Sequence, residues 1–207
     1  EPNETSRDKL KHEFGVAVSE DNQAAVANAT VVVLAVKPQI MRKVALALAP
    51  ALKDQAVVVS IAAGISVESL QGWLGSSAAI IRAMPNTPSL VLAGATALFA
   101  NQLATEPQKD IVFKIFQSVG YCCWVEREDQ INAVIALSGS GPAYFFRILE
   151  IMQQVGQELG LSEEIARELA SHTALGAAQM AKKSTSSPSE LRRQVTSPGG
   201  TTERALS

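Results

Sequence analysis

The stretch Val31–Met41, with the sequence VVVLAVKPQIM, decides how the first part of the chain folds. Its first six residues, Val31–Val36, are apolar on both faces of an extended strand, which indicates a central strand covered by helices on both sides. Pro38 then stands where a helix begins, because a first helical residue leaves its N–H unpaired and proline has none. A buried strand that turns directly into a helix is typical of a parallel sheet with crossover helices.

This alternation continues through the first two-thirds of the chain. The expected strands are Val31–Val36, Ala56–Ile61, Ala79–Ala83, Thr96–Phe99 and Tyr121–Val125, and the expected helices are Asp8–Phe14, Gln39–Leu48, Val67–Leu74 and Glu106–Gln117. Strands that alternate with helices predict a doubly wound α/β domain. We place this domain at residues 1–126.

Residues 127–207 have a different, helical character. One long helix is expected over 129–159, interrupted at Ser138–Pro142 (SGSGP), where proline and glycine permit a kink or let a ligand approach the backbone. A second helix begins after Ser162, and its small residues over Ile165–Lys182, Gly176 among them, predict close packing against another helix. The second domain is therefore predicted to be all-α.

Composition excludes several classes of protein. The 207 residues are 47% hydrophobic with a net charge of −2 and 5% aromatic residues, which indicates a soluble globular protein without the basic, aromatic surface of a nucleic-acid binder. No apolar run approaches the roughly 20 residues of a membrane span. The adjacent Cys122 and Cys123 would point to opposite faces of a strand, so we expect reduced thiols and a cytoplasmic protein. His12 and His172 have no ligand-spaced neighbours, and no metal site is expected.

Three candidate ligand loops follow the first three expected strands. They are Ala35–Pro38 (AVKP), Ser60–Gly64 (SIAAG) and Arg82–Pro88 (RAMPNTP). In open α/β sheets, ligands bind outside the carboxyl ends of the strands, so these loops favour a shared pocket. The first and third loops are each also compatible with an ordinary turn.

The stretch Ser197–Thr202 (SPGGTT) is a fourth candidate. A proline and two glycines predict a tight turn, and two threonines then place hydroxyls and unpaired N–H groups at a helix start. Such a turn could bind a carboxylate or phosphate, or it could simply cap the helix. Elsewhere, no GxGxxG loop is found in a strand-to-helix context. No Ser-His-Asp or Cys-His arrangement is found either, so hydrolysis is not predicted.

The ordered set AVKP, SIAAG, RAMPNTP, SGSGPAY and SPGGTT resembles the pyrroline-5-carboxylate reductase family along almost the whole chain. The resemblance implies a Rossmann-type doubly wound parallel sheet followed by an all-α dimerisation domain. It also implies reduction of 1-pyrroline-5-carboxylate to L-proline with NADPH or NADH, the last step of proline biosynthesis, by a homodimer or higher homo-oligomer. We expect the family's first strand with its phosphate loop, and its last helices, to be absent from these 207 residues.

The resemblance also assigns residues to roles. The implied cofactor-binding residues are Asn22, Ala35, Val36, Lys37, Pro38, Ala62, Ala63 and Asn86, with Arg7 near where a 2′-phosphate could lie. Asn22 is expected just before a short helix over Ala25–Ala29. The implied substrate-binding residues are Ser197, Gly199, Gly200 and Thr201, which would hold the carboxylate. Thr202 matches the residue whose hydroxyl hydrogen-bonds the ring nitrogen of the substrate, and is the implied catalytic residue.

Two alternatives remain open. A β-hydroxyacid dehydrogenase would share this plan but would use a lysine on the long interdomain helix, and residues 129–159 contain no lysine. A non-catalytic nucleotide-binding dimer module would explain the sheet and the small-residue helix, yet would leave the SPGGTT turn without a purpose.

Overall fold

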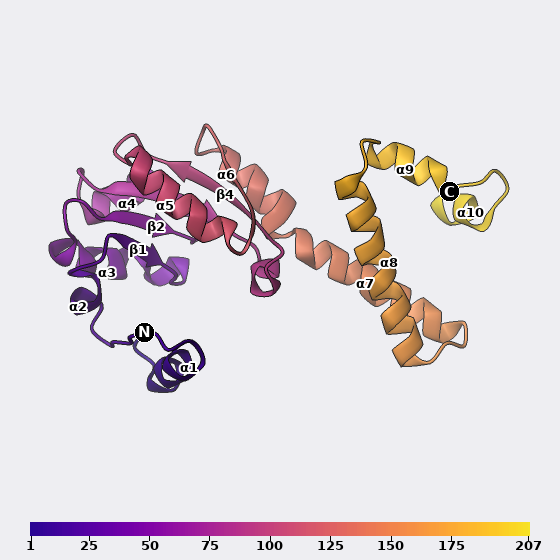
Figure 1. Ribbon diagram of the computed structural model, residues 1–207, viewed down its shortest axis with the longest axis horizontal. Coiled ribbons are helices and arrows are strands. Elements are labelled where there is room, and N and C mark those ends of the chain that lie inside the picture. The colour runs from indigo at the N-terminus through magenta and orange to yellow at the C-terminus, as the bar shows by residue number, and fades with distance from the viewer. The chain divides into compact units, whose positions relative to one another are not determined.

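The computed structural model describes all residues, 1–207, and they form two compact units, Glu1–Pro142 and Ala143–Ser207. The first unit contains one five-stranded sheet (Figure 1). Its strands are β1 (Val31–Leu34), β2 (Val57–Ser60), β3 (Ala79–Met84), β4 (Gly94–Ala100) and β5 (Gly120–Trp124), in that order across the sheet. All five expected strands are therefore confirmed, each within a few residues of its predicted bounds.

One strand departs from the predicted parallel sheet. β4 runs antiparallel to β3, whereas the pairs β1·β2, β2·β3 and β4·β5 are parallel. The reason is the connection: a parallel crossover needs a dozen or more residues, whereas β3 and β4 are joined by a turn built around the short 3₁₀ helix η2 (Thr87–Val91). The sheet is parallel-dominated and mixed.

Helices cover both faces of the sheet. The first unit contains α1 (Glu4–Phe14), α2 (Asn22–Val26), α3 (Pro38–Leu48), the 3₁₀ helix η1 (Ala49–Ala51), α4 (Val67–Leu74), α5 (Glu106–Gln117) and α6 (Gln130–Val134). Met41, Leu70 and Ile80 belong to a buried cluster under α3 and α4, and Ile81 and Val112 belong to a second cluster under α5. Two cores on opposite faces confirm the doubly wound arrangement.

β1 lies at an edge of the sheet, and the prediction that it is a central strand is wrong for this structure. Val32 and Leu34 are buried, but Val33 is 46% exposed. Side-chain alternation reports which faces of a strand are covered. It contains no information on whether the backbone groups along each side of that strand are paired.

A π-helical turn, η3 (Ile135–Gly139), follows α6, and α7 (Gly141–Glu158) begins two residues later. The predicted interruption at SGSGP is thus confirmed, and its form is a widened turn in which Ser140 N–H donates to the Ile135 carbonyl at 2.8 Å. Single π turns of this kind inside helices occur frequently at functional sites.

The second unit is helical throughout. It contains most of α7, then α8 (Glu163–Lys183), α9 (Pro188–Gln194) and α10 (Thr201–Leu206). The predicted helix start at Ser162 is confirmed, because its hydroxyl accepts from Ile165 N–H. Between α7 and α8, a Cβ at Gly156 would lie 3.1 Å from the Ala166 Cβ, so small residues do let these helices approach closely. No helix in the structure is long and apolar enough to cross a membrane.

The compact units divide at Pro142, whereas the sequence placed the domain boundary at residue 126. The intervening segment contains α6, which packs against β4 with Ile131 fully buried, and η3, whose Gly139 lies beside Met84 of β3. Contacts within each unit place the division at Pro142, whereas the chain changes from strands to helices after residue 126, and the domain boundary at 126 stays a prediction.

Candidate functional site

The ends of β1, β2 and β3 lie at the same edge of the sheet, because the three strands are parallel. This carboxyl edge carries the loops that follow Leu34, Ser60 and Met84. Loops at the carboxyl ends of neighbouring parallel strands are where open α/β sheets bind their ligands. The three candidate loops are thereby brought to one edge of the molecule.

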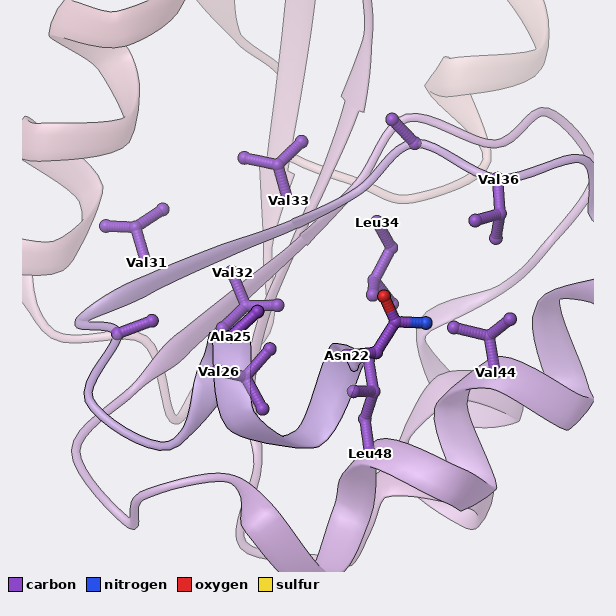
Figure 2. Close-up of a pocket in the computed structure, with 12 residues that line it drawn as sticks. Asn22, Ala25, Val26, Val31, Val32, Val33, Leu34, Val36, Val44 and Leu48 are labelled. Carbon is purple, nitrogen blue, oxygen red and sulfur yellow. The ribbon is translucent and has the colours of Figure 1, made fainter. Parts of the chain in front are cut away.

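An open pocket of about 270 Å³ lies along β1, between α2 and α3 (Figure 2). It is lined by Asn22, Ala25, Val26, Ala29, Val31, Val32, Val33, Leu34, Ala35, Val36, Val44 and Leu48. Three predicted cofactor residues, Asn22, Ala35 and Val36, therefore share one cavity. The Asn22 carboxamide is the only side chain in this lining with hydrogen-bonding atoms.

Asn22 is held by the start of α2. It is the first residue of that helix, after Asp21, whose carboxylate accepts hydrogen bonds from Gln23 N–H and Ala24 N–H. The sequence placed Asn22 before a helix at Ala25–Ala29, so the helix was predicted about three residues too late. The missed signal is Asp21, a residue type that caps helices well.

The other residues predicted on β1 and β2 do not line this pocket. Lys37 is exposed and stands at the N-cap of α3, and Pro38 is its first residue, as predicted. Ala62 is buried, and its N–H donates to the Ser60 hydroxyl at 3.3 Å, whereas Ala63 is exposed. These residues lie at the carboxyl edge and outside the pocket. Arg7 is already paired, because it donates to the carbonyl oxygens of Glu1 and Pro2 at 2.9 and 2.7 Å.

Asn86 uses both ends of its carboxamide within the protein. Its Oδ1 accepts from Ala95 N–H at 2.8 Å, and its Nδ2 donates to the Ser138 carbonyl at 3.0 Å. The residue therefore joins the β3–β4 turn to the π turn η3, a role that the sequence did not indicate.

An ion pair that the sequence analysis missed supports the loop after β2. Arg82 on β3 is 7% exposed, and its guanidinium lies 2.6 Å from Glu128 Oε1. The same oxygen accepts from Val67 N–H at 2.7 Å, at the start of α4. A lone arginine in the apolar strand AIIRAM was the available signal, because a buried charge needs a partner.

The Ser197–Thr202 stretch folds into the predicted turn and helix start. Gly199 has φ +72°, a conformation that glycine adopts without strain, and Gly200 N–H donates to the Ser197 carbonyl at 3.0 Å. Gly200 is the N-cap of α10, so Thr201 and Thr202 are its first two residues. Glu203, which the sequence analysis did not consider, accepts from Gly199 N–H at 2.6 Å through its own carboxylate.

The Cys122 thiol is a poor nucleophile in this structure. Burial, with a smaller contribution from the neighbouring Cys123, raises the pKa of the Cys122 thiol to about 11. Thiolate is therefore scarce at neutral pH, and thiolate is the reactive form. Both cysteines are free, as predicted, and no group of three or more potential metal ligands occurs in the structure.

A doubly wound sheet with a pocket along β1 and candidate ligand loops at its carboxyl edge, followed by a helical segment, places the chain among the Rossmann-type NAD(P)-dependent oxidoreductases. A family model described as pyrroline-5-carboxylate reductase dimerisation matches residues 128–207, and one described as NADP oxidoreductase, coenzyme F420-dependent, matches residues 1–64. The chain belongs to the pyrroline-5-carboxylate reductase family.

Individual relatives agree along the whole chain. A pyrroline-5-carboxylate reductase of Pseudomonas aeruginosa is 51% identical over 206 residues, which cover 100% of this chain and 76% of that protein. The structure of the enzyme from Coxiella burnetii matches with a TM-score of 0.89 and 45% identity over 99% of this chain and 76% of its own. A Plasmodium falciparum pyrroline carboxylate reductase with NADP bound matches with a TM-score of 0.88 and 31% identity over 94% and 73%.

Proposed function

We propose that this protein reduces 1-pyrroline-5-carboxylate to L-proline with NADPH or NADH, the last step of proline biosynthesis. The observation that carries the proposal is the 51% identity to a pyrroline-5-carboxylate reductase along the whole chain. The relative with NADP bound supports NADP as the cofactor. Two free cysteines suit a reducing compartment, and we place the enzyme in the cytoplasm.

The residues around the β1 pocket fit part of a dinucleotide. Asn22 can both donate and accept hydrogen bonds, and the Ala35–Val36 segment is exposed or half-buried, with short side chains that leave its backbone accessible. The rest of the lining is apolar, as in most cofactor sites. When bound, NAD(P)H supplies the hydride that reduces the imine carbon. The residues of this chain would hold and orient the cofactor. Lys37, Pro38, Ala62 and Ala63 would contact it further along the carboxyl edge of the sheet.

We assign the substrate carboxylate to the Ser197–Thr202 turn. The first N–H groups of α10 have no partner within the helix, and the positive end of its dipole favours an anion. The Gly199 N–H already donates a hydrogen bond to the Glu203 carboxylate, which supports the proposal that this turn binds a carboxylate. A substrate carboxylate would use the N–H groups of Thr201 and Thr202, or would displace Glu203.

Thr202 is proposed to orient the ring nitrogen of the substrate through its hydroxyl. A protonated imine is already electrophilic, so the protein does not need a strong acid. Orientation of the substrate then accounts for most of the rate enhancement. Thr202 is half-buried in the first turn of α10, beside the N–H groups assigned to the carboxylate.

We also propose that the helical unit forms a homodimer. Phe145 and Phe146 on α7 are 63% and 62% exposed, and Ile165 and Leu169 on α8 are 50% and 56% exposed. Exposed apolar side chains of this size along a helix indicate that another surface covers it. The dimerisation model that matches residues 128–207 supports a second copy as the partner.

The activity is tested with the full-length protein by following oxidation of NADPH and of NADH, in separate assays, with 1-pyrroline-5-carboxylate as the substrate. A 3-hydroxy acid with NADP⁺ or NAD⁺ is the control for the alternative dehydrogenase. We expect NAD(P)H oxidation with the imine and no reaction with the hydroxy acid. The opposite result would assign the chain to the hydroxyacid enzymes, and no turnover of either would favour a binding module.

Thr202→Ala should lower kcat/KM by about 1–2 kcal/mol, a roughly 5- to 30-fold loss, because it removes one hydrogen bond to the substrate. Thr202→Ser keeps a hydroxyl and should retain most of the activity. Thr196→Ala is the matched control, since the Thr196 hydroxyl donates to the Arg192 carbonyl at 2.7 Å within the protein. Unchanged kinetics in Thr202→Ala would remove this residue from the mechanism.

A further inference from the structure

The side chain of Asn86 joins the turn between β3 and β4 to a distant part of the chain by hydrogen bonds. Asn86 opens the turn, in an extended conformation with φ −130°, and Ala95 lies at its far end on β4. The Asn86 carboxamide closes the turn through Ala95 N–H and also reaches Ser138, 52 residues further along the chain. The orientation of this carboxamide is determined by its partners, because an N–H must face its oxygen and a carbonyl must face its nitrogen.

The Ser138 carbonyl lacks its usual α-helical donor for a reason that the sequence explains. In an α-helix its carbonyl would accept from the residue four positions later, which is Pro142, and proline has no N–H. Buried or half-buried carbonyl groups are almost always paired. The Asn86 Nδ2 supplies a donor to this carbonyl from outside the helix, at 3.0 Å.

The π turn η3 lies beside the carboxyl end of β3. The methyl end of Met84, the last residue of β3, would lie 2.9 Å from a Cβ placed on Gly139. This is the edge at which the parallel strands β1 and β2 also end. Asn86 thus holds η3 against the edge where open α/β sheets bind ligands.

We infer that Asn86 is a positioning residue of the reductase: its carboxamide locks the β3–β4 turn to the π turn η3 and so keeps the ligand-binding edge in its active geometry. This inference rests on the proposed function. Displacement of reactants by about 1 Å can slow a reaction by about 100-fold. The β1 pocket with Asn22, Ala35 and Val36 is two strands away from β3, so we expect loss of this lock to change the affinity for the cofactor much less than it changes kcat.

The chain contains a matched control. Asn101 makes the same two kinds of bond, since its Oδ1 accepts from Ile80 N–H at 3.1 Å and its Nδ2 donates to the Ala78 carbonyl at 2.9 Å. Ala78 and Ile80 are at the amino end of β3, which is the edge opposite to the loops of the site. Asn101 therefore stabilises the fold by the same bonds without touching the carboxyl edge.

The test compares Asn86→Asp with Asn101→Asp in the full-length protein. In each variant the carboxylate still accepts from the backbone N–H but can no longer donate, and it repels the carbonyl that it faces. We measure kcat and KM with 1-pyrroline-5-carboxylate, the Kd for NADP⁺ by titration calorimetry, and hydrogen exchange of the amides of residues 135–140. All measurements are made at least 15 °C below the Tm of each variant.

For Asn86→Asp we expect kcat to fall about 10- to 100-fold, Kd for NADP⁺ to stay within twofold, and exchange at 135–140 to accelerate. For Asn101→Asp we expect a lower Tm, with kcat and exchange at 135–140 unchanged. Unchanged kcat in Asn86→Asp, or an equal loss in both variants, would overturn the inference. A Kd for NADP⁺ raised tenfold or more would make Asn86 a direct cofactor ligand instead.

Failure of the proposed function gives a different result. A wild-type protein that does not reduce the imine would refute the reductase assignment while the exchange comparison could still be made. Faster exchange at 135–140 in Asn86→Asp alone would then confirm the lock and limit its role to structure, which overturns the catalytic part of the inference.

Discussion

Leu92 is the one residue other than glycine with a positive φ, at 58° with ψ 24°, and it is 71% exposed. It ends the 3₁₀ helix η2, and its N–H donates to the Ser89 carbonyl at 3.1 Å. A leucine in this left-handed conformation is strained by roughly 1–2 kcal/mol, because its Cβ approaches the following carbonyl. The conformational strain of the β3–β4 turn is therefore concentrated at Leu92. This residue lies six positions after Asn86.

Leu92→Gly should stabilise the protein by about 1 kcal/mol, since glycine relieves the strain at φ 58° and little buried contact is lost. In a protein of this size the change corresponds to a rise of roughly 2–4 °C in Tm, measurable by calorimetry. Leu90→Gly is the control: Leu90 is 88% exposed in the same turn but has an ordinary negative φ. A Tm that rises equally in both variants would show that loss of an exposed leucine, and not relief of strain, is responsible.

At the scale of elements, α4 depends on a partner far away in the sequence. Ser66 caps the helix by accepting from Ser69 N–H, and Glu128 adds a second acceptor for Val67 N–H while it neutralises Arg82. One carboxylate oxygen thus connects the start of a helix, a buried strand and the segment before α6. The SIAAG loop ends at Gly64, two residues before Ser66, so these contacts fix the start of the helix into which the loop leads.

Glu128→Ala should reduce the free energy of unfolding by about 2 kcal/mol, because it leaves a buried guanidinium without a partner and removes a helix-capping acceptor. The double variant Arg82→Met, Glu128→Ala should recover part of this loss. Asp129→Ala is the control, because its ion pair with Arg127 is about two-thirds exposed on both sides and should contribute less than about 0.5 kcal/mol. Urea unfolding checks all three, and equal losses at 128 and 129 would contradict the argument.

At the scale of the whole molecule, the helical unit has almost no core of its own. Ala166 and Ala170 are its only buried hydrophobic residues, although α7 and α8 carry many large apolar side chains that are exposed. Helices of this kind are stable when another surface covers their apolar faces. Association is therefore expected to be part of how residues 143–207 become stable.

Gly176→Leu tests this expectation. Apart from its sequence neighbours and the backbone of its own helix, no atom lies within 4 Å of a Cβ at Gly176, so a leucine fits within one copy but would obstruct a helix packed there from a second copy. We expect sedimentation velocity to show weaker self-association with unchanged helix content by circular dichroism. Gly72→Leu is the control, since Gly72 lies in α4 with the same free space around it. Self-association that is unaffected by Gly176→Leu would show that the helix face around Gly176 is not an interface.

Much of this fold could be predicted because the deciding signals are local. The run Val31–Val36, the proline at the start of α3 and the serine before α8 each act within a few residues, and each gave the correct element. The site could be predicted only as a set of loops, because the strand-end rule gives an edge and not the contacts made there. The lock from Asn86 to Ser138 and the pair of Arg82 with Glu128 join residues 52 and 46 positions apart, and no local pattern reports such pairs.

The sequence by itself determined the order of strands and helices along the chain and the interruption before Pro142. Through its ordered motifs it also determined the family. These follow from side-chain periodicity, capping and backbone freedom, which act over a few residues. The tertiary structure alone decided that β4 runs antiparallel to β3, that β1 lies at an edge and that Asn86 is committed to two backbone groups. Those outcomes depend on which backbone donors and acceptors meet across the folded sheet, and hydrogen bonds between distant segments exist only once the chain has closed around them.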